Sequence, residues 1–140
     1  MRTNTVLTNG CFDILHVGHI RLFKYCKTLA DYLIVLLNSD VSVRSLEKGP
    51  NRPINCQTER YELLNSIKYI DEVIIFEENT PCSIISSLKP QFYVKGGDYK
   101  IENIPESKIV KNYGGEIIAF EHTGHSTTKL VDKINDYKKI

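Results

Sequence analysis

Residues 8–19 read Thr8-Asn9-Gly10-Cys11-Phe12-Asp13-Ile14-Leu15-His16-Val17-Gly18-His19. The apolar run Thr5-Val6-Leu7 comes directly before them and predicts a β-strand that stops at the turn signal Asn9-Gly10. Apolar residues from Ile14 to Leu29 are spaced loosely as a helix face requires. His16 and His19 therefore fall at positions i and i+3, on one side of the first turn of a helix.

A helix that begins with two histidines is suited to hold phosphate. Its first N–H groups are unpaired and carry about half a positive charge, which attracts anions. Gly18 leaves the turn without a side chain, so a bulky group can approach. The same spacing is also half of a metal site, or the histidines have no function at all. The strand–turn–helix context favours phosphate, because α/β sheets bind ligands where their strands end.

Length and composition predict one domain over residues 1–140 with an ordinary buried core. The formal net charge of +1 gives no reason to expect bulk electrostatic binding to nucleic acid or a membrane. No apolar run approaches the roughly 20 residues of a membrane span. The sequence enters its first strand without a signal peptide, and its four cysteines form no CxxC pair. We therefore expect reduced thiols and a cytoplasmic protein.

Strands and helices are predicted to alternate along the rest of the chain. The strands fall at residues 31–37, 73–76, 92–94 and 117–120, and the helices at 41–47, 57–68, from Thr80-Pro81, 104–113 and 126–137. In the helix at 57–68, Tyr61, Leu64 and Ile67 share the apolar face. Residues 48–53, with two prolines and a glycine, predict a loop. Such alternation is typical of βαβ units in a parallel, doubly wound α/β sheet.

Several motifs occur in the order found in the cytidylyltransferase-like nucleotidyltransferases, and the chain resembles that family over nearly its whole length. The motifs are Asn9–Asp13 followed by His16-Val17-Gly18-His19, Asn38-Ser39-Asp40, Glu59-Arg60, Val94-Lys95-Gly96-Gly97-Asp98-Tyr99-Lys100 and Ser126-Thr127-Thr128. The resemblance implies a Rossmann-like sheet of five parallel strands in the order 3-2-1-4-5, with helices on both faces. It also implies a homodimer.

The polar clusters follow strands or open helices, so a parallel sheet brings them to one edge around a crevice suited to a nucleoside triphosphate. The resemblance implies that a sugar or polyol phosphate attacks the α-phosphorus of ATP or CTP and releases pyrophosphate. Positioning and electrostatic stabilisation then supply most of the catalysis, without a strong general base or a covalent intermediate. We expect no tightly bound metal, with Mg²⁺ arriving on the triphosphate.

The candidate site residues fall into two groups. We expect His16, His19 and Lys95 to be catalytic. We expect the nucleotide to be bound by Thr8, Asn9, Gly10, Cys11, Phe12, Asp13, Gly18, Arg60, Gly96, Asp98, Ser126, Thr127 and Thr128.

The reasons for these assignments differ from residue to residue. Lys95 neutralises phosphate charge unless it is a plain surface lysine, and Gly96 with Gly97 lets backbone N–H groups approach a ligand. The Ser-Thr-Thr triplet offers hydroxyls at a helix start. Asp13 either orients the loop or a histidine, or reaches the magnesium ion.

Further roles come from the family or stay open. Arg60 matches the arginine of a family motif, although a pairing with Glu59 or Glu62 is equally consistent. The resemblance also implies a loop that closes over the phosphates, here with Arg44, Lys48 and Arg52, which could equally be solvated.

Two branches of the family compete. Residues 76–81, 94–100 and 113–116 resemble the heptose 1-phosphate adenylyltransferases, which make an ADP-heptose. The glycerol-3-phosphate cytidylyltransferases usually carry a tryptophan at the position of residues 94–100, and this chain has no tryptophan. They also carry an arginine shortly before their Ser-Thr-Thr triplet, and residues 121–125 of this chain contain none. A non-catalytic nucleotide sensor would be expected to lose a histidine. A zinc site of His16, His19, His122 and His125 lacks cysteine or carboxylate companions. His125, just before the triplet, either adds a donor to the triphosphate or faces solvent.

Overall fold

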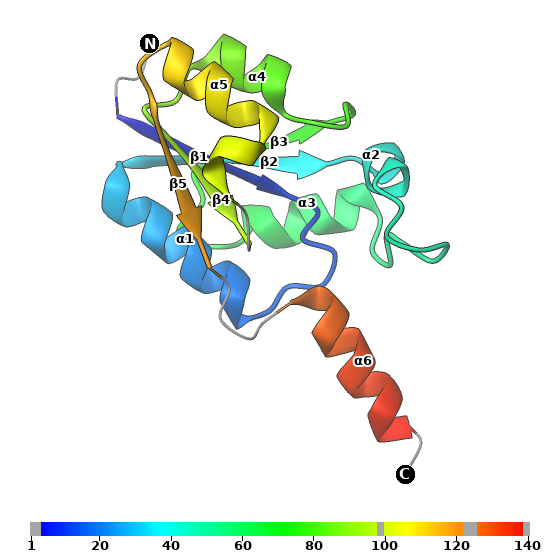
Figure 1. Cartoon of the computed structure of the whole chain (residues 1–140). Helices are drawn as coiled ribbons and strands as arrows, with labels where there is room; N and C mark the ends of the chain where they lie inside the picture. The colour runs from blue at the N-terminus through cyan, green and yellow to red at the C-terminus, as the bar shows by residue number, and fades with distance from the viewer. Residues whose placement is uncertain (1–3, 98–99, 122–125, 139–140) are drawn as a thin grey trace.

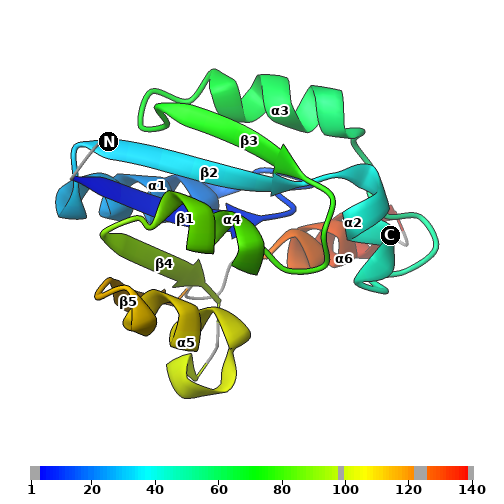
Figure 2. The same ribbon diagram turned by 90° about the horizontal axis from the view of Figure 1, so that it is seen from above.

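Five strands form one parallel sheet in the computed structural model, which describes residues 4–97, 100–121 and 126–138 (Figure 1). They are β1 (Thr5–Gly10), β2 (Tyr32–Asn38), β3 (Glu72–Phe76), β4 (Phe92–Gly96) and β5 (Glu116–Phe120). Their order is β3-β2-β1-β4-β5, which can be followed across Figure 2. The predicted α/β class and the 3-2-1-4-5 order are confirmed.

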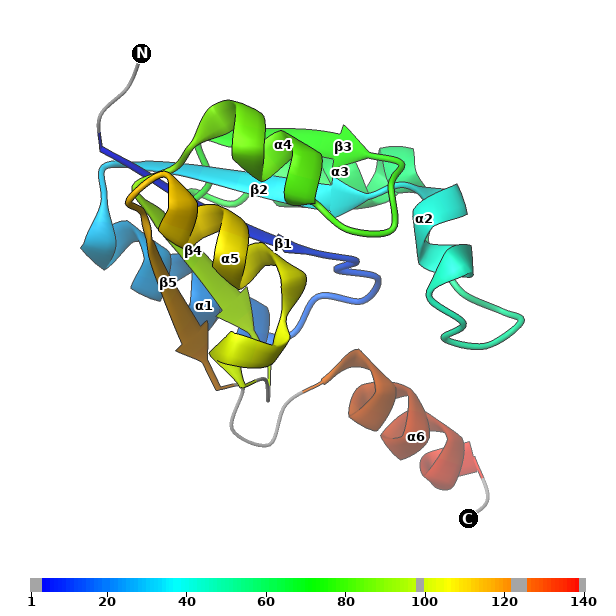
Figure 3. The same ribbon diagram turned by 45° about the horizontal axis from the view of Figure 1, so that its top comes forward.

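Helices cover both faces of the sheet. They are α1 (Val17–Leu29), α2 (Asp40–Ser45), α3 (Gln57–Asn65), α4 (Cys82–Leu88), α5 (Pro105–Asn112) and α6 (Thr127–Lys138), with a 3₁₀ turn η1 (Ile101–Asn103) before α5. In Figure 1, α4 and α5 lie above the sheet, while α1 and α3 lie below it. Figure 3 shows α6 projecting away from the sheet on the side where the strands end.

The apolar run of β2 explains why both faces are covered. Side chains alternate along a strand, and here Leu33, Val35 and Leu37 pack into the cluster of α1 and α3. Ile34 and Leu36 point the other way, into the cluster of α4 and α5. A strand that is aliphatic at every position, as β2 is from residue 33 to residue 37, can be buried only between two layers of helices.

Two local predictions were wrong. Asn9 and Gly10 form no turn, because both residues pair with β2 as the last two residues of β1, and the chain turns instead at Phe12 with a φ of 48°. α3 ends at Asn65 rather than Lys68, and Tyr61 is 38% exposed. The buried positions of α3 are Leu64 and the charged Arg60. Arg60 can be buried because it donates hydrogen bonds to carbonyl oxygens beneath the helix, which offset the cost of removing its charge from water.

No described helix combines the length and the apolar character that a membrane span requires.

Candidate functional site

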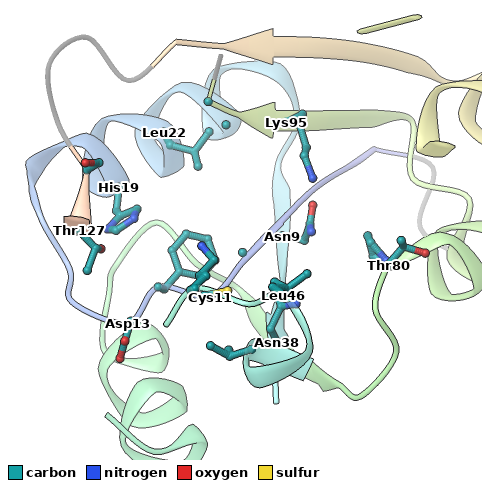
Figure 4. A pocket seen from close by; sticks show the side chains of 18 of the residues that line it. Asn9, Cys11, Asp13, His19, Leu22, Asn38, Leu46, Thr80, Lys95 and Thr127 are labelled. Atoms are coloured by element: carbon teal, nitrogen blue, oxygen red, sulfur yellow. The ribbon is translucent and has the colours of Figure 1, made fainter. Parts of the chain in front are cut away.

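A cavity of about 840 Å³ opens where the strands end (Figure 4). It is bordered by residues 9–13, both histidines of the motif, residues 95–97, the loop positions Lys48 and Arg52, and the start of α6. Figure 4 shows Lys95 pointing toward Asn9, and His19 lying close to Thr127. The edge at which the sequence placed its polar clusters is therefore hollow, and large enough for a nucleotide.

The two histidines begin α1 by capping each other. Nδ1 of His16, the N-cap residue, accepts the Gly18 N–H at 3.1 Å, and Nδ1 of His19 accepts the His16 N–H at 3.2 Å. A nitrogen that accepts cannot carry the proton, so each neutral ring is protonated on Nε2. The rings stack with centroids 3.8 Å apart. The helix cap thus fixes the tautomer and the orientation of both rings, and makes Nε2–H of each a donor.

Phe12 holds His19 from behind. Its ring meets the His19 ring edge-on at 5.1 Å and lies 5.3 Å from Phe23 of α1. A Cβ atom on Gly10 would lie 3.0 Å from the Phe12 ring, which would have to shift by a few tenths of an ångström to accommodate it. Phe12 lines the cavity and packs between the first turn of α1 and Phe23.

Asp13 anchors the loop of residues 46–56, hereafter the basic loop. Its carboxylate accepts the N–H groups of Ile54 and Asn55 at 2.8–2.9 Å, and Arg52 Nη1 lies 3.6 Å away. Lys48 and Arg52 on this loop line the cavity. Asp13 therefore occupies the orienting role predicted for it, and its partner is the basic loop rather than a histidine.

Arg60 does not line the cavity, contrary to its predicted contact with the nucleotide. Its side chain is 0% exposed and donates to the carbonyl oxygens of Asn55, Cys11 and Asn38 at 2.7–2.9 Å. Nη2 also pairs with Asp40 at 2.8 Å. Burial and these four bonds keep the guanidinium from a ligand, and the side chain instead ties together three segments behind the cavity wall.

Thr8 and Gly18 also lie beneath the wall. The buried Thr8 hydroxyl donates to the Val94 carbonyl at 2.7 Å, and Gly18 is buried within α1. The cavity lining includes Asn9, Gly10, Cys11, Phe12, Asp13, Gly96, Ser126, Thr127 and Thr128. Asp98 lies outside the described residues, as do His122 and His125.

The start of α6 faces the histidines. Ser126 Oγ accepts the Lys129 N–H at 3.0 Å, and Thr127 Oγ1 donates to the Ile14 carbonyl at 2.9 Å. Ser126 thus caps the helix in the ordinary way. Thr127 fastens α6 to residues 11–16, which lead from β1 into α1 and are hereafter called the histidine loop. Two positive helix ends, those of α1 and α6, converge on one cavity.

Lys95 enters the cavity from the end of β4. Its Nζ lies 3.8 Å from Oε1 of Glu106 in the first turn of α5. Sequence reasoning missed Glu106, and it also missed residues 79–81, which follow β3 and line the cavity. An acidic residue directly after Pro105, at the start of a helix that follows a strand end, was the available signal for Glu106.

Cys11 is the only cysteine in the cavity lining, and burial raises the pKa of its thiol. The charges of Lys48 and Arg60 oppose that shift without cancelling it. A thiol with a raised pKa is a poor nucleophile at neutral pH, so Cys11 contributes shape rather than covalent chemistry.

Alkylation of the folded protein at neutral pH should follow these environments. Cys56 is exposed and should react first, whereas Cys26 is buried with its pKa raised to about 12 and should stay unmodified. Peptide mass spectrometry after iodoacetamide treatment measures this order, with the urea-unfolded chain, in which all four cysteines react, as the control. Equal rates at Cys26 and Cys56 in the folded protein would contradict the burial of Cys26.

Among the described residues, no three histidine, cysteine, aspartate or glutamate side chains gather closely enough to hold a metal ion. Asp13 and Glu106 are the carboxylates in the described cavity lining, and each faces a cation. Carboxylate oxygens are ligands that Mg²⁺ takes in proteins, so these two side chains fit a magnesium ion that arrives with phosphates.

Known proteins resemble this chain over most of its length. It is 47% identical over 131 residues to the bifunctional protein HldE of Geotalea uraniireducens, a match that covers 92% of this chain and 26% of that protein. It is 48% identical over 133 residues to the bifunctional protein HldE of Campylobacter jejuni subsp. doylei, covering 95% of this chain and 28% of that one. The chain thus spans about a quarter of the length of these relatives.

A solved structure resembles this chain in fold. The lipopolysaccharide core biosynthesis protein of Thermoplasma volcanium superposes with a TM-score of 0.71 at 28% identity, over 84% of this chain and 95% of that one. A family model described as cytidylyltransferase-like matches residues 7–135, which include the histidine loop, the ends of the strands and the start of α6. This chain belongs to the cytidylyltransferase-like family.

Proposed function

We propose that the chain is a nucleotidyltransferase that transfers AMP from ATP to a heptose 1-phosphate, with release of pyrophosphate. The observation that carries the proposal is the pair of stacked imidazoles in the cavity lining, whose Nδ1 atoms are engaged at the helix start, so that Nε2–H is the donor of each ring. The similarity to bifunctional HldE proteins, together with the motif at residues 94–100, favours adenine and a heptose over the alternatives.

In the proposed reaction, a phosphate oxygen of the acceptor forms a bond to the α-phosphorus of the triphosphate. The bond from that phosphorus to the bridging oxygen breaks, and pyrophosphate leaves with the electron pair. Negative charge grows on the oxygens around the α-phosphorus, where His16 and His19 donate hydrogen bonds that strengthen in the transition state. The attacking phosphate is already ionised, so no side chain has to remove a proton.

Cationic side chains around the cavity balance the charge of two phosphorylated substrates. Lys95 stands at the end of β4, and the basic loop brings Lys48 and Arg52 from the other side. Asp13 binds the N–H groups of Ile54 and Asn55 and pairs with Arg52, so it holds this end of the loop, with Arg52, at the cavity. Magnesium is expected to enter with ATP, as the substrate MgATP, which adds further charge neutralisation.

A matrix of substrates tests the proposal. Purified protein is incubated with ATP or CTP against heptose 1-phosphate or glycerol 3-phosphate, and pyrophosphate release is measured with and without Mg²⁺. We expect ATP with heptose 1-phosphate to give the highest kcat/KM, and chelation to abolish turnover. A clear preference for CTP with glycerol 3-phosphate would move the chain to the other branch of the family. Absence of release from every pair would contradict nucleotidyl transfer itself.

The predicted homodimer and cytoplasmic location stay predictions, as does the role of His125. Sedimentation of the purified chain measures the first directly.

A further inference from the structure

Glu106 is a buried carboxylate whose Oε2 atom has no hydrogen-bond partner among the described residues. It occupies the first turn of α5 and is 3% exposed, yet it belongs to the lining of the cavity. No described residue donates a hydrogen bond to its Oε2 atom. Its Oε1 atom faces Lys95 Nζ at 3.8 Å, which is longer than a hydrogen bond.

Such an arrangement is unfavourable unless something completes it. A carboxylate that loses water and gains no donor keeps most of its desolvation penalty. Lys95 faces the carboxyl group, but at 3.8 Å it does not supply the missing hydrogen bond. Since a carboxyl group turns easily about its last torsion angle, either oxygen can meet a donor that enters the cavity.

The charge of Glu106 indicates which part of a substrate it can meet. A carboxylate repels phosphate and accepts hydrogen bonds from neutral donors, of which sugar hydroxyls are the most numerous in the proposed substrates. Lys95 lies beside it and attracts phosphate. Together the two side chains match a molecule that carries a phosphate and a hydroxyl a few ångströms apart.

We propose that Glu106 binds a hydroxyl group of a sugar, and so selects polyhydroxylated substrates, while Lys95 binds the neighbouring phosphate. This inference rests on the proposed nucleotidyl transfer. The hydroxyl belongs either to the acceptor sugar or to the ribose of the nucleotide, and both present the same chemistry to the carboxylate.

The test combines changes in the protein with changes in the substrate. Steady-state constants are measured for Glu106→Ala, Glu106→Gln and the wild type. The control is Glu102→Gln, which removes an acidic charge from the exposed turn just before α5. One arm compares heptose 1-phosphate with its monodeoxy derivatives, and the other compares ATP with 2′-deoxy-ATP and 3′-deoxy-ATP.

In the wild type, we expect removal of the bound hydroxyl to raise KM for that substrate roughly ten- to a hundredfold, the usual effect of a hydrogen bond to a charged group. Glu106→Ala should show equal KM values for the complete and the deoxy substrate, because the acceptor is gone. Glu106→Gln retains a carbonyl acceptor and should recover part of the discrimination. Glu102→Gln should discriminate as the wild type does.

Two results would overturn the inference. Glu106→Ala could raise KM by the same factor for every substrate, which would mean that Glu106 acts only through Lys95. Wild-type protein could also show the same KM for every deoxy substrate as for the complete one, which would mean that water, not a substrate hydroxyl, donates the hydrogen bond to Oε2 of Glu106. Calorimetric titration with ATP, the sugar phosphate and their deoxy forms gives the same comparison without turnover. An inactive wild type would therefore contradict the proposed function, while the binding data still decide the role of Glu106.

Discussion

Replacing His16 or His19 with alanine should lower kcat by at least about a hundredfold, the usual effect of removing a donor to the transition state. The expected loss lies in kcat more than in KM, because the bonds from Nε2 strengthen as charge develops on phosphorus. Either alanine also removes one half of the reciprocal cap at the start of α1. Turnover and stability therefore have to be measured on the same variants.

Asparagine at position 16 separates the two roles of the histidine. Its short side chain is a good N-cap and can still accept the Gly18 N–H, but it carries no imidazole toward the cavity. His16→Asn should thus be folded and nearly inactive. Val17→Ala is the matched control, because Val17 stands in the same turn with its side chain largely exposed. Turnover like that of the wild type in folded His16→Asn would remove His16 from the mechanism.

Replacing Arg60 with methionine should destabilise the protein by about 3–5 kcal/mol, the range for breaking a buried ion pair by removing one partner. The change leaves Asp40 without its partner and three backbone carbonyls without their donor. Arg60→Lys should recover little, since an ammonium group cannot reach these separated acceptors as a planar guanidinium does. Urea unfolding followed by circular dichroism measures both losses.

Arg21→Met provides the control for Arg60→Met. It makes the same chemical change on the exposed side of α1 and should cost well under 1 kcal/mol. A similarly small loss for Arg60→Met would show that the buried guanidinium is dispensable. A large loss of unfolding free energy would support a structural role for Arg60 rather than a contact to the nucleotide.

The sequence predicted the sheet well because the apolar pattern of its strands is dictated by burial. The near-continuous apolar run at residues 31–37 can be buried on both faces only between two layers of helices. It forms β2, whose bounds lie within one residue of the prediction. Burial misled the same reasoning in α3. Tyr61 looks like a core residue, and Arg60 looks like a solvated one or a ligand contact, until the carbonyls beneath the helix are known.

The candidate site divides along the same line. His16, His19 and Lys95 were found because a local motif places them at the end of a strand or the start of a helix, and all three line the cavity. Glu106 was missed because its importance depends on its burial beside Lys95, and no motif links these two residues, which belong to α5 and β4. The anchoring of the basic loop by Asp13 is likewise a contact that joins residues 41 and 42 positions apart, which no local pattern reports.

The bond from Thr127 to the Ile14 carbonyl spans 113 residues. During synthesis, the loop that carries Ile14 leaves the ribosome well before α6, because 113 residues separate the two ends of this bond. A nascent chain therefore displays its reactive imidazoles long before the opposite wall exists. Fragments that end before α6 lack this wall of the cavity, so we expect them to catalyse none of the proposed transfer.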